Sequence, residues 1–335
     1  MAAPGRKIKA LLFALPLTLV FANCGDDQKT NQKPLPNPKP EAKVDVPKFS
    51  ADSAYAFIQA QVDFGPRVPG TPEHKACGDY LVRKFSTWTD TVVEQYSTVT
   101  RFDGQSLPMR NIIASINPSK SNRIALFAHW DTRFTSDKEP SGDRKPIDGA
   151  NDGGSGVAVL MEMARVLSKN KPDLGIDFIL FDVEDQGKPA DLDLQETGTS
   201  WCLGSQYWSK NLHQKNYYAK FGVLLDMVGG ENAVFTQEGV SRTRAPQVLK
   251  KVWQTGHKLG YGSFFSYEAT PEILDDHVFV NYFAHIPTID IIAYDHGTES
   301  KFYQHWHTLK DDMEGISKAP LKAVGQTLLH VIYTD

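Results

Sequence analysis

Residues 124–130 read IALFAHW, and residues 176–183 read IDFILFDV; both are dense apolar runs bounded by polar or turn-forming residues. Further runs of this character lie at 111–116, 221–227 and 286–293. Short apolar runs with turn residues at both ends are typical of buried β-strands. These strands are the framework from which the rest of the fold is predicted.

Helical patterns lie between and around these strands, at 72–86, 156–168, 245–260 and 319–333. Buried strands that alternate with helices favour a mostly parallel sheet with helices on both faces. No internal repeat and no second linker interrupts residues 50–335. We therefore predict a single α/β domain over these residues, built on a mostly parallel, twisted central sheet.

Polar side chains stand where the predicted strands end. His129 is at the end of the second strand, Glu184 and Asp185 follow the third, and Asp226 is at the end of the fourth. Open α/β sheets bind ligands beyond the carboxyl ends of their strands, so these side chains are candidates for a shared site. Because neighbouring residues of a strand face opposite sides, Glu184 and Asp185 are expected to point in different directions.

Two further candidates lie outside the strands. Asp152 stands in the turn GANDGGSG at 149–156, and His307 stands in WHT at 306–308. Gly153 and Gly154 would let the backbone approach a crowded site closely. Taken alone, each Asp or His fits a helix cap or a surface residue better than a metal ligand. Together, carboxylates and imidazoles with one open position are what a catalytic zinc site requires.

These motifs make the chain similar to the zinc aminopeptidase clan, and within that clan it resembles the glutaminyl cyclases, with the closer match to the bacterial branch. The resemblance covers nearly all of residues 50–335 in order and spacing. It is carried by FGPRVPGTP at 64–72, HWDT at 129–132, GANDGGSG at 149–156, FDVED at 181–185, LD at 225–226, LDDH at 274–277 and WHT at 306–308. The resemblance implies a zinc aminopeptidase-like fold and the cyclisation of N-terminal glutamine of peptides or proteins to pyroglutamate, with release of ammonia.

The resemblance also implies roles for individual residues at the metal. Asp152, Asp185 and His307 would hold one zinc ion. Glu184 would be the general acid/base that moves protons during the reaction. A zinc ion with three protein ligands keeps a position for substrate, as a catalytic site needs.

The surrounding pocket follows from the same resemblance. Asp226 and Asp275 would form an acidic hydrogen-bonded network, and Trp306 would stack against the substrate. Trp201 is a second candidate for the pocket wall, with ordinary core packing as the alternative for both tryptophans. Asp290 stands where the animal cyclases carry His, so the acidic network is expected to be wired differently here.

A two-zinc aminopeptidase on the same scaffold is the main alternative. His129 and Asp226 are the residues that hydrolases of the clan use for a second zinc, with Asp152 shared between the two ions. The cyclase is favoured by Trp306 immediately before His307, by the DDH segment at 275–277, and by Asp185 where the hydrolases usually carry Glu. A catalytically inactive peptide-binding protein is a third reading, and the intact acid/base and ligand set argue against it.

The N-terminus differs in kind from the rest. Arg6, Lys7 and Lys9 precede an apolar run at 10–22 that is too short to span a bilayer, as in a secretory signal peptide. The run ends in FANC, and Cys24 resembles the lipidated cysteine of bacterial lipoproteins, with cleavage without a lipid as the alternative. Residues 25–49 have the composition of a flexible tether. We predict an exported, lipid-anchored protein in the periplasm or on the outer membrane of a Gram-negative cell.

Composition sets further limits. The 335 residues carry a formal net charge of −4 with both signs interspersed, so no nucleic-acid surface is expected. Beyond Cys24, the cysteines are Cys77 and Cys202, and the sequence leaves open whether they form a disulfide. The protein is expected to be a monomer.

Overall fold

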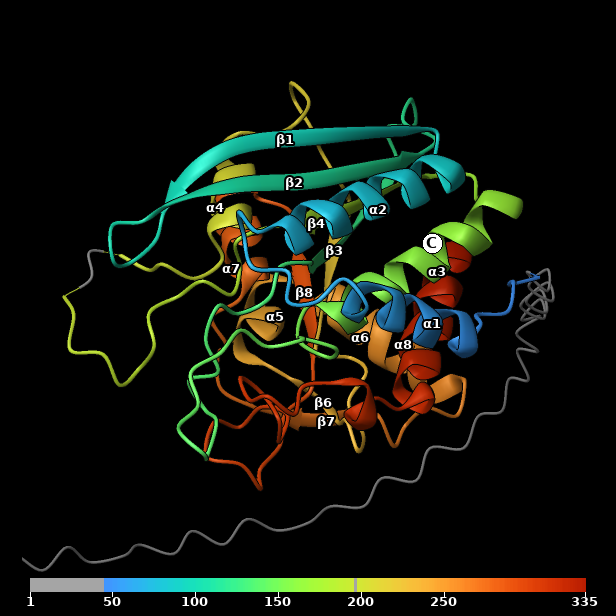
Figure 1. The fold of residues 1–335 in the computed structure, drawn as a ribbon. Helices are drawn as coiled ribbons and strands as arrows, with labels where there is room; N and C mark the ends of the chain where they lie inside the picture. Colours follow the sequence, from blue (N-terminus) through green and yellow to red (C-terminus); the bar gives the residue numbers. More distant parts are fainter. Residues whose placement is uncertain (1–44, 196–197) are drawn as a thin grey trace, which may run out of the picture. The chain divides into compact units, whose positions relative to one another are not determined.

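A mixed β-sheet forms the centre of the fold (Figure 1). In the computed structural model, which describes residues 45–195 and 198–335, six strands form this sheet in the order β1-β2-β4-β3-β5-β8. Strands β4, β3, β5 and β8 run parallel, whereas β2 is antiparallel to β4 and β1 is antiparallel to β2. The bounds are β1 Thr91–Thr100, β2 Ser106–Ile116, β3 Arg123–His129, β4 Gly175–Phe181, β5 Phe221–Asp226 and β8 Thr288–Ile292. The predicted α/β domain with a mostly parallel central sheet is confirmed.

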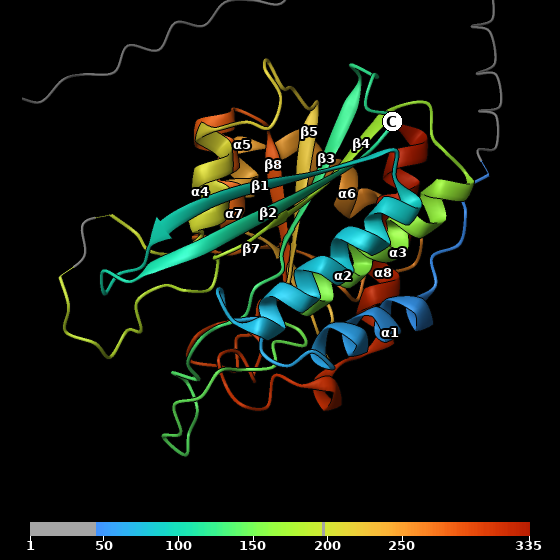
Figure 2. The same ribbon diagram turned by 45° about the horizontal axis from the view of Figure 1, so that its top comes forward.

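Helices cover both faces of this sheet (Figures 1 and 2). One face is covered by α2 Pro72–Trp88, α3 Gly154–Lys169, α6 Pro246–Lys258 and α8 Lys318–Thr334, and α1 Ala51–Val62 packs against α3 and α8. The other face packs against α4 Leu203–Lys210 and the π-helical turn η1 Val280–Ala284, which follows the short helix α7 Asp276–Phe279. The remaining elements are α5 Gly239–Arg244, the 3-10 turn η2 Met313–Gly315, and the small parallel sheet of β6 Phe235–Gln237 and β7 Phe265–Ala269.

Coverage of both faces explains why the central strands read as continuous apolar runs. Ile124 and Leu126 of β3 lie in the core under α3, whereas Ala125 and Phe127 lie in the core on the opposite face. The ring of Phe127 packs against Trp208, with centroids 5.7 Å apart. Full burial of one such aromatic side chain contributes roughly 1.5–3 kcal/mol to stability.

Several elements were not predicted, and their sequences show why. The buried face of α1 consists of Ala54, Ile58 and Gln61, which do not make an apolar stripe. The edge strand β1 alternates between exposed and half-buried positions, so it carries no apolar run. Predictions of α2, α3, α6 and α8 are confirmed with small shifts at their ends. For α2 the start follows from its cap, because Thr71 accepts a hydrogen bond from the N–H of His74 and Pro72 is the first helical residue.

The predicted signal peptide, Cys24 and most of the predicted tether lie outside the described residues. Just before α1, Phe49 is buried and its N–H donates to Oε1 of Gln326 in α8 at 3.0 Å. Both cysteines of the described part, Cys77 and Cys202, are buried and free. Across residues 45–195 and 198–335, every helix is too short or too polar to cross a membrane.

Candidate metal centre

The candidate site lies at the carboxyl ends of the parallel strands. His129 is the last residue of β3 and Asp226 is the last residue of β5, and both are buried. A cavity of about 430 Å³ lies at this edge of the sheet. Every residue that the cyclase interpretation assigned to zinc, to catalysis or to substrate lines this cavity: Asp152, Glu184, Asp185, Trp201, Asp226, Asp275, Trp306 and His307.

The three predicted zinc ligands come together within the cavity wall. Nε2 of His307 lies 3.1 Å from Oδ1 of Asp185 and 3.7 Å from Oδ2 of Asp152. All three residues are buried, and each offers a ligand atom within 4.8 Å of the others. Oδ2 of Asp152 and Oδ2 of Asp185 have no hydrogen-bond partner among the described residues. Two unpaired buried carboxylate oxygens beside an imidazole nitrogen fit a zinc ion.

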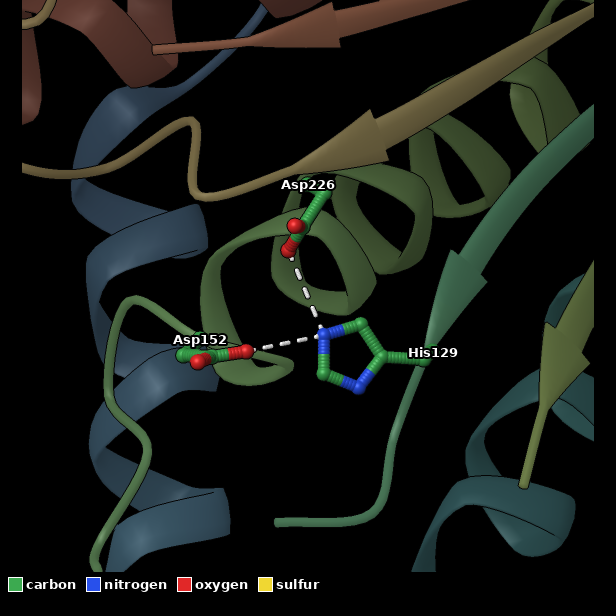
Figure 3. Close-up of side chains that lie close together, drawn as sticks. All are labelled: His129, Asp152 and Asp226. Carbon is green, nitrogen blue, oxygen red and sulfur yellow. Dashed lines mark hydrogen bonds and ion pairs between the residues drawn. The ribbon is translucent and has the colours of Figure 1, made fainter. Parts of the chain in front are cut away.

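A second donor set shares one ligand with the first (Figure 3). Nε2 of His129 lies 3.1 Å from Oδ1 of Asp152 and 3.2 Å from Oδ1 of Asp226. Burial by itself would lower the pKa of His129, but contacts with Asp131, Asp152 and Asp226 raise it well above its usual value. The three side chains can therefore either hold a second metal or form a closed hydrogen-bonded group around a protonated imidazole.

Two further carboxylates, those of Asp131 and Asp137, contact the candidate ligands or their backbone. Asp131 accepts hydrogen bonds from the N–H groups of Glu184 and Asp185 at 3.0 and 3.2 Å. Oδ1 of Asp137 lies 3.1 Å from Nδ1 of His307, which directs the other ring nitrogen towards the ligand cluster. Sequence reasoning missed both supporting residues. Asp131 was visible in the HWDT motif, whereas nothing local marks Asp137.

Glu184 and Asp185 have different partners, since Glu184 contacts the thiol of Cys202 and Asp185 contacts the ring of His307, but strand alternation is not the cause. Strand β4 ends at Phe181, so the alternation of a strand does not extend to these residues. They follow a turn in which Val183 has φ 55°, the left-handed region that β-branched residues rarely adopt. The side chain of Glu184 is 13% exposed at the cavity. Burial raises its pKa well above the usual range of a glutamic acid.

Aromatic side chains form part of the cavity wall. The rings of Trp306 and His307 stack with centroids 3.6 Å apart, and Trp201 stacks on the same imidazole at 5.8 Å. Phe302, which the sequence did not single out, lines the cavity and packs against Trp306 at 4.9 Å. Trp201 reaches this position because Gly187 has no side chain: a Cβ there would lie 2.0 Å from the indole.

An acidic group continues from the cavity into the protein. Asp275 lines the cavity at the start of α7, and burial raises its pKa to about 6. Behind it, Asp290 is fully buried, with Nδ1 of His277 3.9 Å away. Nε2 of His277 in turn lies 3.2 Å from Oε1 of Glu238. The imidazole of this buried network therefore belongs to His277 on α7, whereas Asp290 on β8 contributes a carboxylate.

Comparison with known proteins places this arrangement in a family. Residues 111–332 match peptidase family M28. The structure is similar to that of a glutaminyl cyclase from Bacteroides thetaiotaomicron bound to N-acetylhistamine, with 51% sequence identity and a TM-score of 0.85, over 87% of this chain and 100% of that chain. A Zn-dependent exopeptidase from Parabacteroides distasonis is similar at 49% identity and a TM-score of 0.85, again over 87% of this chain and 100% of that chain.

A more distant relative belongs to an animal. The glutaminyl-peptide cyclotransferase of Gloydius blomhoffii is 26% identical over 299 residues, which cover 78% of this chain and 75% of that protein. The resemblance to bacterial glutaminyl cyclases that the motifs indicated is confirmed by these similarities. With a family match that spans more than half of its length, the chain belongs to peptidase family M28.

Proposed function

We propose that this protein is a zinc-dependent glutaminyl-peptide cyclotransferase, which converts N-terminal glutamine of peptides or proteins to pyroglutamate and releases ammonia. The similarity to a glutaminyl cyclase at 51% identity supports this choice. The structural observation that carries it is the placement of Glu184 beside the set Asp152, Asp185 and His307 in one cavity. Trp201 and Trp306 give that cavity an apolar wall.

One zinc ion is proposed at Asp152, Asp185 and His307. Bound there, zinc supplies Lewis acidity towards the γ-carbonyl oxygen of the substrate glutamine. Substrate positioning and proton transfer are proposed for side chains of the protein. Trp306 and Trp201 would hold the glutamine side chain folded back, so that its own α-amine meets the side-chain amide carbon.

Glu184 is proposed to move the proton. The reaction forms a bond from the α-nitrogen to the side-chain amide carbon and breaks the bond from that carbon to the amide nitrogen, without consuming water. Glu184 would take a proton from the attacking nitrogen and deliver it to the departing nitrogen, which leaves as ammonia. A positioned acid/base of this kind accelerates such transfers by roughly two to four orders of magnitude.

Asp226 and Asp275 are proposed to bind the substrate amine. Both carboxylates line the cavity, and each can accept a hydrogen bond from an ammonium group. Asp275 is backed by Asp290 and His277 within the buried acidic group. This placement supports the reading of the DDH segment as part of the site.

A two-zinc aminopeptidase is the second candidate. It is favoured by the placement of His129 and Asp226 around the oxygen of Asp152, because the same side chains could hold a second ion. The similarity to a Zn-dependent exopeptidase points the same way. In the cyclase, His129 would instead keep Asp226 and Asp152 in position by hydrogen bonding.

The purified protein incubated with a Gln-initiated dipeptide separates these candidates. Ammonia and free glutamine are measured together, and the zinc content per chain is determined by mass spectrometry. The expected result is release of ammonia, a peptide product that is lighter than the substrate by the mass of ammonia, and one zinc ion per chain. Free glutamine without ammonia, at two zinc ions per chain, would show an aminopeptidase, and bound zinc without any product would show an inactive binding protein.

We also propose that the protein is exported and anchored by a lipid at Cys24. The support is the sequence alone: a basic start, the apolar run at 10–22, and a polar segment that follows Cys24. Incorporation of labelled palmitate in the wild type and its loss in Cys24→Ser is the expected result. Equal labelling of both proteins would contradict the lipid anchor.

A monomer is proposed for the catalytic form, and sedimentation equilibrium measures the oligomeric state directly.

A further inference from the structure

The motif at 64–72 contains a buried cation that the proposed chemistry does not use. The guanidinium of Arg67, in the segment between α1 and α2, is 0% exposed. Among the described residues no carboxylate forms an ion pair with it. Burial lowers the pKa of Arg67, while the charges of Asp311 and other nearby acids act in the opposite direction. Burying a charge without a direct ion pair costs free energy of desolvation, so the other contacts of Arg67 must offset that cost.

The side-chain contacts of Arg67 all go to backbone carbonyls, at the end of β3 and at the start of the turn that carries Asp152. Nη2 of Arg67 donates to the carbonyl of Gly149 at 2.8 Å, and Nη1 donates to the carbonyl of Asp148. Nε donates to the carbonyl of Trp130 at 3.4 Å, directly after β3. One rigid, planar group thus joins the end of β3 to the start of the turn that carries Asp152.

Asp311 holds the same turn from the other side. Its Oδ1 accepts the N–H of Asn151 at 2.9 Å, and its Oδ2 accepts the N–H of Asp152 at 3.0 Å. Asp311 is 1% exposed and lies beyond the ligand His307 in the chain. The carbonyls of the turn therefore face a fixed cation, and its N–H groups face a fixed carboxyl.

We propose that Arg67 and Asp311 are positioning residues that clamp the turn at 148–152, so that the Asp152 carboxylate is held in its ligand geometry before zinc binds. This inference rests on the zinc site of the proposed function. It assigns a role to the FGPRVPGTP motif, which supplies none of the proposed ligands and no side chain to the cavity at the metal centre. Lysine keeps the charge of Arg67 but cannot reach three carbonyls with one planar fork.

The test compares Arg67→Lys and Asp311→Asn with Arg123→Lys. Arg123 is a matched control, since it is a buried arginine whose Nε pairs with Asp177 at 2.8 Å, at the start of β3 and away from the ligands. Zinc affinity is measured by competition with a chromophoric chelator, and melting temperatures are measured with zinc and with a chelator. Loss of a group that orients a ligand typically weakens metal binding by about 10–100-fold.

Both clamp variants are expected to bind zinc at least about tenfold more weakly than wild type, within the range for orienting groups. The gap between the melting temperatures of the zinc-bound and zinc-free forms should narrow, because ligand stabilisation follows affinity. Arg123→Lys should lower both melting temperatures together and leave zinc affinity unchanged. A role confined to stability would make the clamp variants behave as Arg123→Lys does.

Two results would overturn the clamp. One is wild-type zinc affinity in a folded Arg67→Lys or Asp311→Asn protein. The other is tighter zinc binding by Arg67→Lys, which would mean that the native guanidinium opposes the metal. If Arg67→Lys does not fold, Asp311→Asn decides the matter, because it leaves the cation in place. Failure of wild type to bind zinc at all would instead refute the proposed function.

Discussion

The thiol of Cys202 lies 3.2 Å from Oε1 of Glu184. The two residues are also joined through the backbone, because the N–H of Cys202 donates to the carbonyl of Glu184 at 2.9 Å. Cys202 is 0% exposed and has φ 58°, so its side chain is held in one place behind the proposed acid/base. A thiol donor at this position directs one carboxylate oxygen and leaves the other free for the substrate.

Replacement of Cys202 by alanine should therefore lower kcat with little change in KM. A single hydrogen bond is worth on the order of 1 kcal/mol, which corresponds to a loss of about fivefold in rate. Cys202→Ser should recover most of the rate, because a hydroxyl donates to the same oxygen. Cys77→Ala is the control, since that cysteine is buried in α2 and does not line the cavity. Equal kinetics for Cys202→Ala and wild type would show that the contact is without consequence.

Glu184→Gln and His307→Ala should separate acid/base chemistry from metal binding. Glu184→Gln keeps the shape of the side chain and removes its base, so it should retain zinc and folding and lose roughly two to four orders of magnitude in turnover. His307→Ala should lose the zinc as well, because one of the proposed ligands is gone. Zinc content and kcat are measured on the same preparations. Near-normal turnover in both variants would contradict the site assignment.

Gly187→Ala should raise KM through Trp201. The added Cβ would lie 2.0 Å from the indole, so the ring must leave its stacked position beside His307. The same substitution in a Trp201→Ala background should have little further effect, because the clash has gone and the two sites are in contact. Steady-state kinetics of the four proteins measure this coupling. Additive effects would indicate that Gly187 acts independently of the tryptophan.

His213 should make stability sensitive to acid. Burial lowers its pKa from 6.5 to about 4, and Nδ1 accepts a hydrogen bond from Nε1 of Trp208 at 3.2 Å, which requires the neutral ring. The unfolded chain therefore binds the proton more readily. The contribution of His213 is fully present above pH 6.5 and is lost as the pH falls towards 4. The total loss is at most about 3 kcal/mol.

Urea unfolding of wild type and His213→Asn between pH 4 and 7 measures this effect. The free energy of unfolding should fall less steeply with acidity in His213→Asn, because the asparagine takes up no proton in this range. His296→Asn is the control, since that histidine and its partner Glu268 are exposed and such pairs contribute little to stability. Parallel pH profiles for wild type and His213→Asn would show that another group causes the acid sensitivity.

Much of the fold was predictable because the signals are local. The strands around 124–130 and 176–183 read as apolar runs since both faces of the sheet are covered, and the helix at 72–86 carries its own cap in Thr71 and Pro72. Strand β1 and helix α1 were not predictable in this way. The pairing of β1 and the burial of α1 depend on partners elsewhere in the chain. Their own residues show neither a clear strand alternation nor a clear helical spacing of apolar residues.

The amino-acid sequence by itself determined the order of the elements and the residue types at the strand ends, and therefore the candidates His129, Glu184 and Asp185. The motifs at 149–156 and 306–308 added the candidates Asp152 and His307. It could not determine which side chains meet. Only the tertiary structure decided that Cys202 stands behind Glu184 and that Asp137 lies against the ring of His307. These contacts join loops far apart in the chain, and their distances are set by the parallel sheet that brings the loops to one edge.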